Sequence, residues 1–308
     1  MHKNQIAMIG LAVMGANLAR NIASKWYQVA VYNRTKEVTL EFSLKYRENL
    51  TPFFSLWELV DSLERPRKIM IMVKAWAPVD AVIAELAPLL ESGDMIIDCG
   101  NSYYEDSIRR ESTLRERWIA FVGCGVSGGE EWALHGPSIM PGCLPAEYQL
   151  LEPILSAVAA KDFSWKPCVT HIGNDGAGHF VKMVHNGIEY AVMQMMAEAY
   201  DIFRKGYHMN SWEISQIFAE YNTGLLDSYL FEISIEVLAK KDDLKEGFLL
   251  DAILDVAGAK GTGLWTSEAS LRAGKPTPSI VDATFARMIS AEKPLRTLLA
   301  EHFEHDHS

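Results

Sequence analysis

Cysteines, basic residues and long apolar segments are all scarce in this sequence. Its four cysteines are Cys99, Cys124, Cys143 and Cys168. They are too few for a disulfide scaffold, and no two of them form a Cys-x-x-Cys pair. No apolar run reaches the roughly 18 residues that a membrane span requires. The amino terminus lacks a signal-peptide pattern, because Lys3 leads into only a short apolar stretch. We therefore expect a cytoplasmic protein with no membrane partner.

Basic residues are fewer than acidic residues. The chain has 29 lysines and arginines against 40 acidic residues, which gives a formal net charge of −11. A chain this acidic has no bulk attraction for nucleic acid or for an anionic membrane surface. An anionic small molecule would need a local cluster of Lys, Arg and backbone N–H groups. The tail 301–308 carries three histidines among acids but no apparent further ligand, so we expect a solvated terminus and no metal site.

The first half of the sequence alternates apolar strands with helical patterns. At 308 residues the chain is about twice a typical domain, so two domains are expected. The predicted strands are 6–9, 28–32, 68–73, 94–98 and 119–122. Continuous apolar strands separated by helices indicate βαβ units around a parallel sheet that is buried on both faces.

The pattern changes to helices alone near Gly176. One long helical pattern covers 177–206, with no strand alternation after it. Further helices are expected near 211–221, 225–240 and 280–290. We therefore predict the fold class α/β plus all-α. A Rossmann-like parallel-sheet domain that binds NADP would cover 1–176, and an all-helical domain for substrate binding and dimerisation would cover 177–308.

A glycine-rich turn lies between the first strand and the first helix. It consists of Gly10, Leu11, Ala12, Val13, Met14 and Gly15. Small residues at positions 10, 12 and 15 permit a tight turn and the close approach of a pyrophosphate, although Ala12 replaces the middle glycine of the usual pattern. The helix N-terminus that follows offers N–H groups and partial positive charge to phosphates. The turn therefore predicts a dinucleotide site.

The end of the second strand distinguishes between two cofactors. An NAD enzyme places Asp or Glu about 20 residues after the glycine-rich turn, on the ribose 2′-hydroxyl. Here the strand ends in Asn33, Arg34 and Thr35. Arg34 can stack on adenine and pair with a 2′-phosphate, which a carboxylate would repel. Asn33 and Thr35 add hydrogen-bond donors. The sequence therefore predicts NADP rather than NAD.

A polar stripe runs along the long helical pattern. Its members are Lys182, His185, Asn186 and Glu189, with Tyr190 at the next position. The first four stand at i, i+3, i+4 and i+7, so one helix face carries them all. The residues around them are mostly apolar, which indicates a buried helix whose polar groups need partners. We therefore expect a site between the two domains rather than a solvated surface.

Four segments of the chain resemble the 6-phosphogluconate dehydrogenase family. They are 101–102, 125–131, 176–190 and 259–266. The resemblance covers essentially the whole of 1–290. It implies a homodimeric enzyme of the pentose phosphate pathway. The implied reaction is the NADP-dependent oxidative decarboxylation of 6-phospho-D-gluconate to ribulose 5-phosphate, CO₂ and NADPH.

The same resemblance assigns roles to single residues. Lys182 would accept the proton of the C3 hydroxyl as general base, and Glu189 would protonate the enediol carbon as general acid. The residues that line the cofactor would include Val73, Lys74, Ala75 and Asn101. The sugar acid and its phosphate would be held by Asn101, Ser127, Gly128, Gly129, His185, Asn186, Tyr190, Lys260 and Arg287. Lys260 and Arg287 would supply the local cationic cluster that an acidic chain needs for a phosphorylated substrate.

The resemblance breaks at the carboxyl end. The family's long form continues well past Arg287 and supplies an Arg and a His to the substrate site of the neighbouring subunit, whereas this chain stops at Ser308. Relative to the family the chain is truncated, so substrate binding is expected to be weakened. Arg296, His302 and His305 are conceivable replacements.

The resemblance also breaks where the family pattern has glycine. Larger residues stand at six such positions: Trp26, Trp76, Trp118, Trp132, Cys99 and Cys143. A Cβ is costly where φ is positive or a backbone contact is close, and Trp132 could crowd the substrate pocket. Two alternatives to an active 6-phosphogluconate dehydrogenase stay open. One is a remnant that binds NADP or merely dimerises, and the other is a related β-hydroxyacid dehydrogenase for an unphosphorylated acid.

Overall fold

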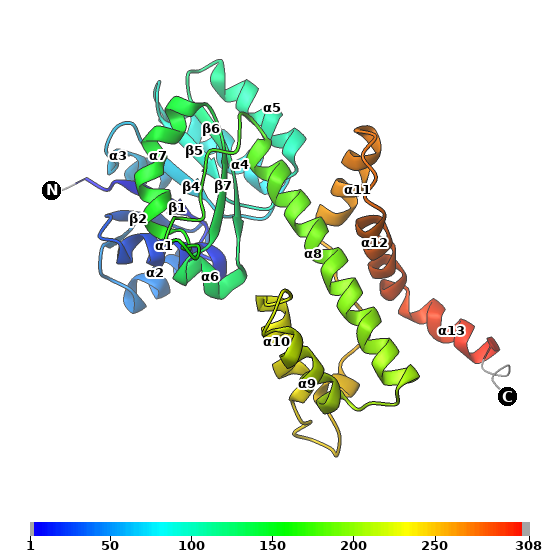
Figure 1. Ribbon diagram of the computed structural model, residues 1–308. Helices are drawn as coiled ribbons and strands as arrows, with labels where there is room; N and C mark the ends of the chain where they lie inside the picture. Colours follow the sequence, from blue (N-terminus) through cyan, green and yellow to red (C-terminus); the bar gives the residue numbers. More distant parts are fainter. Residues whose placement is uncertain (1–2, 304–308) are drawn as a thin grey trace. The chain divides into compact units, whose positions relative to one another are not determined.

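The computed structural model describes residues 3–303, so most of the histidine-containing tail, including His305, lies outside the described residues. The chain divides into two compact units, Met1–Val184 and His185–Ser308 (Figure 1). No helix within residues 3–303 is both long and apolar enough to cross a membrane. Over the same residues, no group of three or more His, Cys, Asp and Glu side chains is placed to hold a metal ion.

A seven-stranded sheet forms the centre of the first unit. Its strands are β1 (Ile6–Ile9), β2 (Val29–Tyr32), β3 (Leu50–Pro52), β4 (Lys68–Ile71), β5 (Met95–Asp98), β6 (Ala120–Ser127) and β7 (Ser138–Gly142). Their order is β3-β2-β1-β4-β5-β6-β7. Every neighbouring pair is parallel except β6 and β7. The five predicted strands and the Rossmann-like arrangement are confirmed.

The sequence does not predict the two edge strands, β3 and β7. Each contains a proline, Pro52 or Pro141, which has no N–H to donate and is therefore confined to the edges of sheets. The antiparallel pairing of β7 with β6 makes the sheet mixed at this edge, whereas the sequence predicts parallel strands only.

Helices cover both faces of the sheet. They are α1 (Val13–Ser24), α2 (Lys36–Lys45), α3 (Leu56–Asp61), α4 (Ala77–Leu86) with the 3-10 turn η1 (Ala87–Leu89), α5 (Tyr104–Arg115), α6 (Gly129–His135) and α7 (Pro145–Val158). Alternate side chains of a strand point to opposite faces. Accordingly, Ile6 and Met8 pack in one core with residues of α1 and α7. Ala7 and Ile9 pack in a second core with residues of α3, α4 and α5. The prediction of a sheet buried on both faces is confirmed.

The second unit is helical. Its elements are α8 (Ala177–Asp201), which begins in the first unit, the π-helical turn η2 (Ile202–Gly206), α9 (Ser211–Tyr221), α10 (Tyr229–Ala239), the 3-10 turn η3 (Leu249–Ala252), α11 (Thr262–Arg272), α12 (Pro278–Ala291) and α13 (Lys293–Phe303). Ile214 and Phe218 of α9 pack on Phe231 and Leu238 of α10. The predicted all-helical character is confirmed. The sequence does not predict α13, or α11, whose Thr, Gly and Ser residues are weak helix formers.

Four tryptophans have the backbone conformation of glycine. Trp26, Trp76 and Trp118 lie at φ values of 69°, 72° and 57°. Trp165 has a φ of 61° and is a residue that the sequence pattern does not single out. The left-handed region is sterically costly for any residue with a Cβ. Trp26, Trp76 and Trp118 therefore have the positive φ that is expected of positions favouring glycine. Trp132 differs, because it lies inside helix α6.

The end of helix α5 shows why glycine would suit position 118. The Trp118 N–H donates to the carbonyl of Arg115 at 2.9 Å, and the Ile119 N–H donates to the carbonyl of Leu114 at 3.1 Å. This pair of bonds defines a Schellman motif, whose left-handed residue is usually glycine. The Trp118 side chain is 76% exposed, so it gains little packing in return.

Replacing Trp118 by glycine is expected to stabilise the protein by about 1 kcal/mol. The left-handed conformation costs a non-glycine residue ~1–2 kcal/mol, and the greater freedom of glycine in the unfolded chain offsets part of that gain. Thermal unfolding should show a melting temperature about 2–4 °C higher. The matched control is Trp57→Gly inside helix α3, where Trp57 is also exposed. Glycine weakens a helix interior, so this variant should melt lower. A lower melting temperature for Trp118→Gly would contradict the assignment of strain.

Candidate cofactor and catalytic site

The glycine-rich turn is built for close backbone packing. Gly10 has a φ of 96°, and a Cβ there would lie 2.3 Å from the carbonyl oxygen of Met72. Helix α1 then begins at Val13 with Ala12 as its N-cap. Alanine has no side-chain oxygen to accept the N–H groups of the first turn. These donors therefore remain suited to phosphate oxygens.

The end of β2 is joined to this turn by a side chain. Asn33 Oδ1 accepts the Leu11 N–H at 3.1 Å, and Asn33 Nδ2 donates to the Thr35 carbonyl at 3.3 Å. Asn33 therefore orders the loop, and its amide group is engaged with protein rather than open to a ligand. Arg34 is exposed beside it. Within residues 3–303, no carboxylate lies within ion-pair distance of Arg34, so its charge is suited to an external anion.

The remaining predicted cofactor residues follow two further strands. Val73, Lys74 and Ala75 follow β4 after one intervening residue, and exposed Asn101 follows β5. The carboxyl ends of parallel strands share one sheet edge, and the strand order reverses between β1 and β4. The structure therefore brings all four predicted cofactor segments to the carboxyl ends of the parallel strands, where open α/β sheets bind ligands. We refer to this end of the sheet as the cofactor edge. Ser127 ends β6 at the same edge, and Gly128 and Gly129 follow it.

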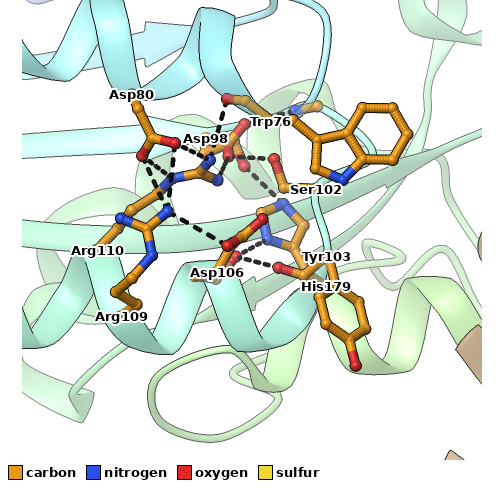
Figure 2. A network of polar contacts seen from close by, with 11 residues as sticks. Trp76, Asp80, Asp98, Ser102, Tyr103, Asp106, Arg109, Arg110 and His179 are labelled. Atoms are coloured by element: carbon orange, nitrogen blue, oxygen red, sulfur yellow. Dashed lines mark hydrogen bonds and ion pairs between the residues drawn. The ribbon is translucent and has the colours of Figure 1, made fainter.

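A buried polar network supports this edge (Figure 2). Asp98, at the end of β5, is fully buried and accepts the Gly100 N–H at 3.0 Å and the Ser102 hydroxyl at 2.6 Å. Both bonds restrain the loop that carries Asn101. Arg110 of α5 lies 3.6 Å from the Asp98 carboxylate. The network therefore restrains the cofactor edge through the loop that follows β5.

Arg110 extends the network to the loop after β4. Its Nε donates to Asp80 Oδ1 at 2.8 Å, and its Nη2 donates to the Trp76 carbonyl at 3.2 Å. The hydrogen bonds from Arg110 and Arg109 lower the pKa of Asp80. Sequence reasoning missed this network, although an Asp that ends an otherwise apolar strand is a detectable signal.

His179 closes the network from helix α8. Its Nε2 lies 3.1 Å from the Asp98 carbonyl, and its Nδ1 lies 2.6 Å from the Ser107 hydroxyl. A carbonyl only accepts, so Nε2 carries the proton and Nδ1 accepts the hydroxyl proton. Burial is the main cause that lowers the pKa of His179 below its ordinary value of 6.5. The imidazole is therefore neutral at physiological pH.

The neutral His179 is expected to make stability depend on pH. Below about pH 6.5 the unfolded chain takes up a proton at this side chain that the folded chain resists, so the free energy of unfolding falls until the lowered folded pKa is reached. His179→Gln removes this proton uptake. Urea unfolding of the two proteins should therefore show a stability difference that shrinks as the pH falls from about 7 to about 5. Exposed His135→Gln is the control. A difference that is constant with pH would contradict the assignment.

Lys182 lies three residues after His179 on α8 and is also buried, with 8% of its surface exposed. The helix approaches strand β6 closely there, because a Cβ at Gly125 would lie 2.5 Å from Lys182 Cβ. The first unit thus contains both the cofactor edge and the predicted general base.

The other members of the polar stripe belong to the second unit. His185 Nδ1 lies 3.2 Å from Asn186 Oδ1 and 3.8 Å from Glu189 Oε2. The Arg287 guanidinium of α12 stacks on the Tyr190 ring at 3.6 Å from its centroid and donates to the Gly258 carbonyl. Two predicted substrate residues, Tyr190 and Arg287, are therefore in contact. Lys260 lies in an exposed loop, two residues after Gly258.

Three of the larger residues that are expected to replace glycines of the family pattern lie near predicted site residues. Trp132 packs against Gly128, where a Cβ would lie 2.5 Å from Trp132 Cβ. Trp76 follows Ala75 directly with a φ of 72°. Cys99 is buried next to the Asn101 loop. Cys143 is buried in the core, where desolvation raises the pKa of its thiol to about 12.

Two family models match consecutive parts of the chain. The NAD binding domain of 6-phosphogluconate dehydrogenase matches residues 5–173, and the 6-phosphogluconate dehydrogenase C-terminal domain matches residues 178–308. The two matches meet close to the predicted domain boundary at 176, whereas the compact units divide at Val184.

Curated relatives cover nearly the whole chain. The NADP(+)-dependent, decarboxylating 6-phosphogluconate dehydrogenase of Bacillus subtilis is 52% identical over 297 residues, and the decarboxylating enzyme of Escherichia coli is 49% identical. Each alignment covers 96% of this chain and 63% of the relative. The chain therefore spans less than two thirds of the length of these relatives.

Solved structures show the same similarity. Plasmodium falciparum 6-phosphogluconate dehydrogenase, solved without ligand, with its cofactor NADP+ and with its substrate 6-phosphogluconate, matches with a TM-score of 0.93 and 43% identity over 98% of this chain and 65% of its own. A 3-hydroxyisobutyrate dehydrogenase of Salmonella typhimurium matches with a TM-score of 0.70 at 18% identity. The second similarity concerns the fold alone.

Proposed function

Because this chain belongs to the 6-phosphogluconate dehydrogenase family, we propose that it catalyses the oxidative decarboxylation of 6-phospho-D-gluconate with NADP. The products are ribulose 5-phosphate, CO₂ and NADPH. The observation that carries the proposal is the arrangement of the first unit. Four cofactor segments share one sheet edge, and buried Lys182 packs against β6, whose carboxyl end reaches that edge.

The residues at the cofactor edge fit NADP. The first-turn N–H groups of α1 suit the pyrophosphate, and exposed Arg34 suits the 2′-phosphate. Val73, Lys74, Ala75 and Asn101 would line the nicotinamide half. When bound, NADP+ supplies the hydride acceptor.

The chain's own side chains would move the protons. Lys182 Nζ accepts the proton of the substrate C3 hydroxyl as the C3 hydrogen leaves as hydride. Carbon dioxide then leaves the 3-keto acid, the electron pair of the broken carbon–carbon bond forms the double bond of an enediol, and Lys182 returns its proton to the C3 oxygen. Glu189 protonates the enediol carbon, and the proton of the former C3 hydroxyl leaves to Lys182 as the ketone forms. A lysine suits the first role, because its amine in the neutral form can accept the hydroxyl proton.

The remaining predicted residues would bind the sugar acid. Asn101, Ser127, Gly128, Gly129, His185, Asn186 and Tyr190 would contact its hydroxyl and carboxylate groups, and Lys260 and Arg287 would bind the phosphate. The stacking of Arg287 on Tyr190 supports this role, because it orients the guanidinium before the phosphate binds.

We also propose a cytoplasmic homodimer. Helices α12 and α13 expose Phe285, Ile289, Leu298 and Phe303, an apolar surface that a second subunit would cover. The four cysteines are free thiols, as expected in a reducing compartment. Residues 1–176 and 177–308 remain the proposed functional domains.

The proposed reaction is tested with a panel of acids. With NADP present, the 308-residue chain should reduce the nicotinamide with 6-phosphogluconate and not with gluconate or 3-hydroxyisobutyrate. Preference for an unphosphorylated acid would identify a different β-hydroxyacid dehydrogenase. Binding of NADP without reduction by any acid would indicate a remnant and overturn the proposal.

A further inference from the structure

A groove of about 540 Å³ opens at the amino-terminal edge of the sheet, away from the cofactor edge. It is lined by Arg20, Ala23, Ser24, Trp26, Lys45, Tyr46, Arg47, Glu48, Asn49, Leu50 and Leu134, all within the first unit. Arg34 lies before the first residue of helix α2, whereas the groove lies at the other end of that helix, where its last residue, Lys45, is part of the lining. Ten helical residues span about 15 Å, so the two places are well separated. The groove is not part of the proposed active site.

The groove is positively charged although the chain is acidic. Arg20, Lys45 and Arg47 line it, and Glu48 is the acidic residue among the lining. Within the described chain, none of the three cations has a carboxylate within ion-pair distance. Their charges therefore act together on whatever enters the groove, and they favour an anion.

Aromatic rings lie beside these cations. The Arg20 guanidinium stacks on the Tyr46 ring at 4.1 Å from its centroid, and the Lys45 ammonium lies 5.3 Å from the same ring. Trp26 borders the groove with 77% of its surface exposed. An indole presented in this way offers a flat apolar face next to the positive charges.

The backbone of Trp26 has a conformation that favours glycine. Its φ of 69° lies in the left-handed region, where a Cβ is costly. The side chain recovers little of this cost by packing, because most of it is exposed. Trp118 and Trp165 combine a positive φ with exposure in the same way outside the groove, and what distinguishes Trp26 is the group of cations beside it.

We propose that this groove binds a nucleoside monophosphate. The base stacks on the Trp26 indole, and the phosphate pairs with the guanidinium groups of Arg47 and Arg20, which match phosphate geometry, and with the Lys45 ammonium. A volume of about 540 Å³ lies within the range of about 300–1,000 Å³ typical of small-molecule sites. The site would act independently of the proposed reaction.

Adenosine 5′-monophosphate is the probe for calorimetric titration of the 308-residue chain. Saturating NADP is present, so that the cofactor edge is occupied. We expect one binding event, weakened at least tenfold by Trp26→Gly, which removes a stacking surface, and by Arg47→Glu, which reverses a charge. The controls are Trp57→Gly and Lys166→Glu, which make the same changes at exposed positions outside the groove.

The melting temperature shows whether Trp26→Gly weakens binding by unfolding the protein or by removing the stacking contact with the probe. Glycine suits the backbone at position 26, so Trp26→Gly should melt no lower than the unaltered chain while binding the probe more weakly. Wild-type affinity in both groove variants, or no binding event in the presence of NADP, would overturn the proposal.

Discussion

Replacing Lys182 by methionine is expected to lower the rate of NADPH formation by about 10²–10⁴-fold, the usual contribution of a positioned general base. Methionine fills the space of the lysine stem but cannot accept a proton. Lys182 is buried where α8 packs on β6, so the helix packing should be retained. The base acts on the sugar acid rather than on the cofactor, so the affinity for NADP should stay within about twofold.

Steady-state kinetics measures the rate of NADPH formation, and a titration with NADP measures the affinity for the cofactor. Exposed Lys166→Met is the matched control, and it should leave both unchanged. Retained dehydrogenation in Lys182→Met would show that another residue is the base. Equal loss of NADP affinity and rate would place Lys182 in the cofactor site instead.

The second large effect is expected at Arg34. Arg34→Glu should weaken NADP binding about 100-fold or more and leave NAD binding nearly unchanged. Loss of a charge-assisted hydrogen bond costs about 1.5–3 kcal/mol, and a tenfold change in affinity corresponds to about 1.4 kcal/mol. Repulsion between the new carboxylate and the 2′-phosphate adds to this loss. NAD has no 2′-phosphate and avoids both effects.

Fluorescence titration of the variant with NADP and NAD gives the affinity ratio. Lys166→Glu is the control, because it also reverses a positive charge, at an exposed position outside both the cofactor segments and the groove. The control should keep the wild-type ratio. An unaltered ratio in Arg34→Glu would show that the end of β2 does not bind the 2′-phosphate.

The strands that position the cofactor edge are predictable from sequence. β1, β2, β4, β5 and β6 are buried on both faces and therefore appear as continuous apolar runs. β3 has three residues and ends in Pro52, so its pattern is too short to recognise. β7 contains Pro141 and is stabilised by pairing with β6, a tertiary contact that local sequence does not encode.

The candidate site is predictable only where its residues are close in sequence. The glycine-rich turn and the 182–190 stripe each lie within one segment, so spacing reveals them. The contact of His179 with Asp98 joins residues 81 positions apart, and that of Asp80 with Arg110 joins residues 30 apart. Such pairs depend on the sheet order. The left-handed φ of Trp165 is likewise invisible in composition.

Simultaneous measurement of NADPH and CO₂ tests the central claim most directly. The 308-residue chain is supplied with NADP and 6-phosphogluconate, and both products are followed in one reaction. We predict equal molar amounts of NADPH and CO₂, and neither product when NADP is omitted. NADPH without CO₂ would show a dehydrogenase that does not decarboxylate. A folded chain that binds NADP and releases neither product would contradict the proposed function.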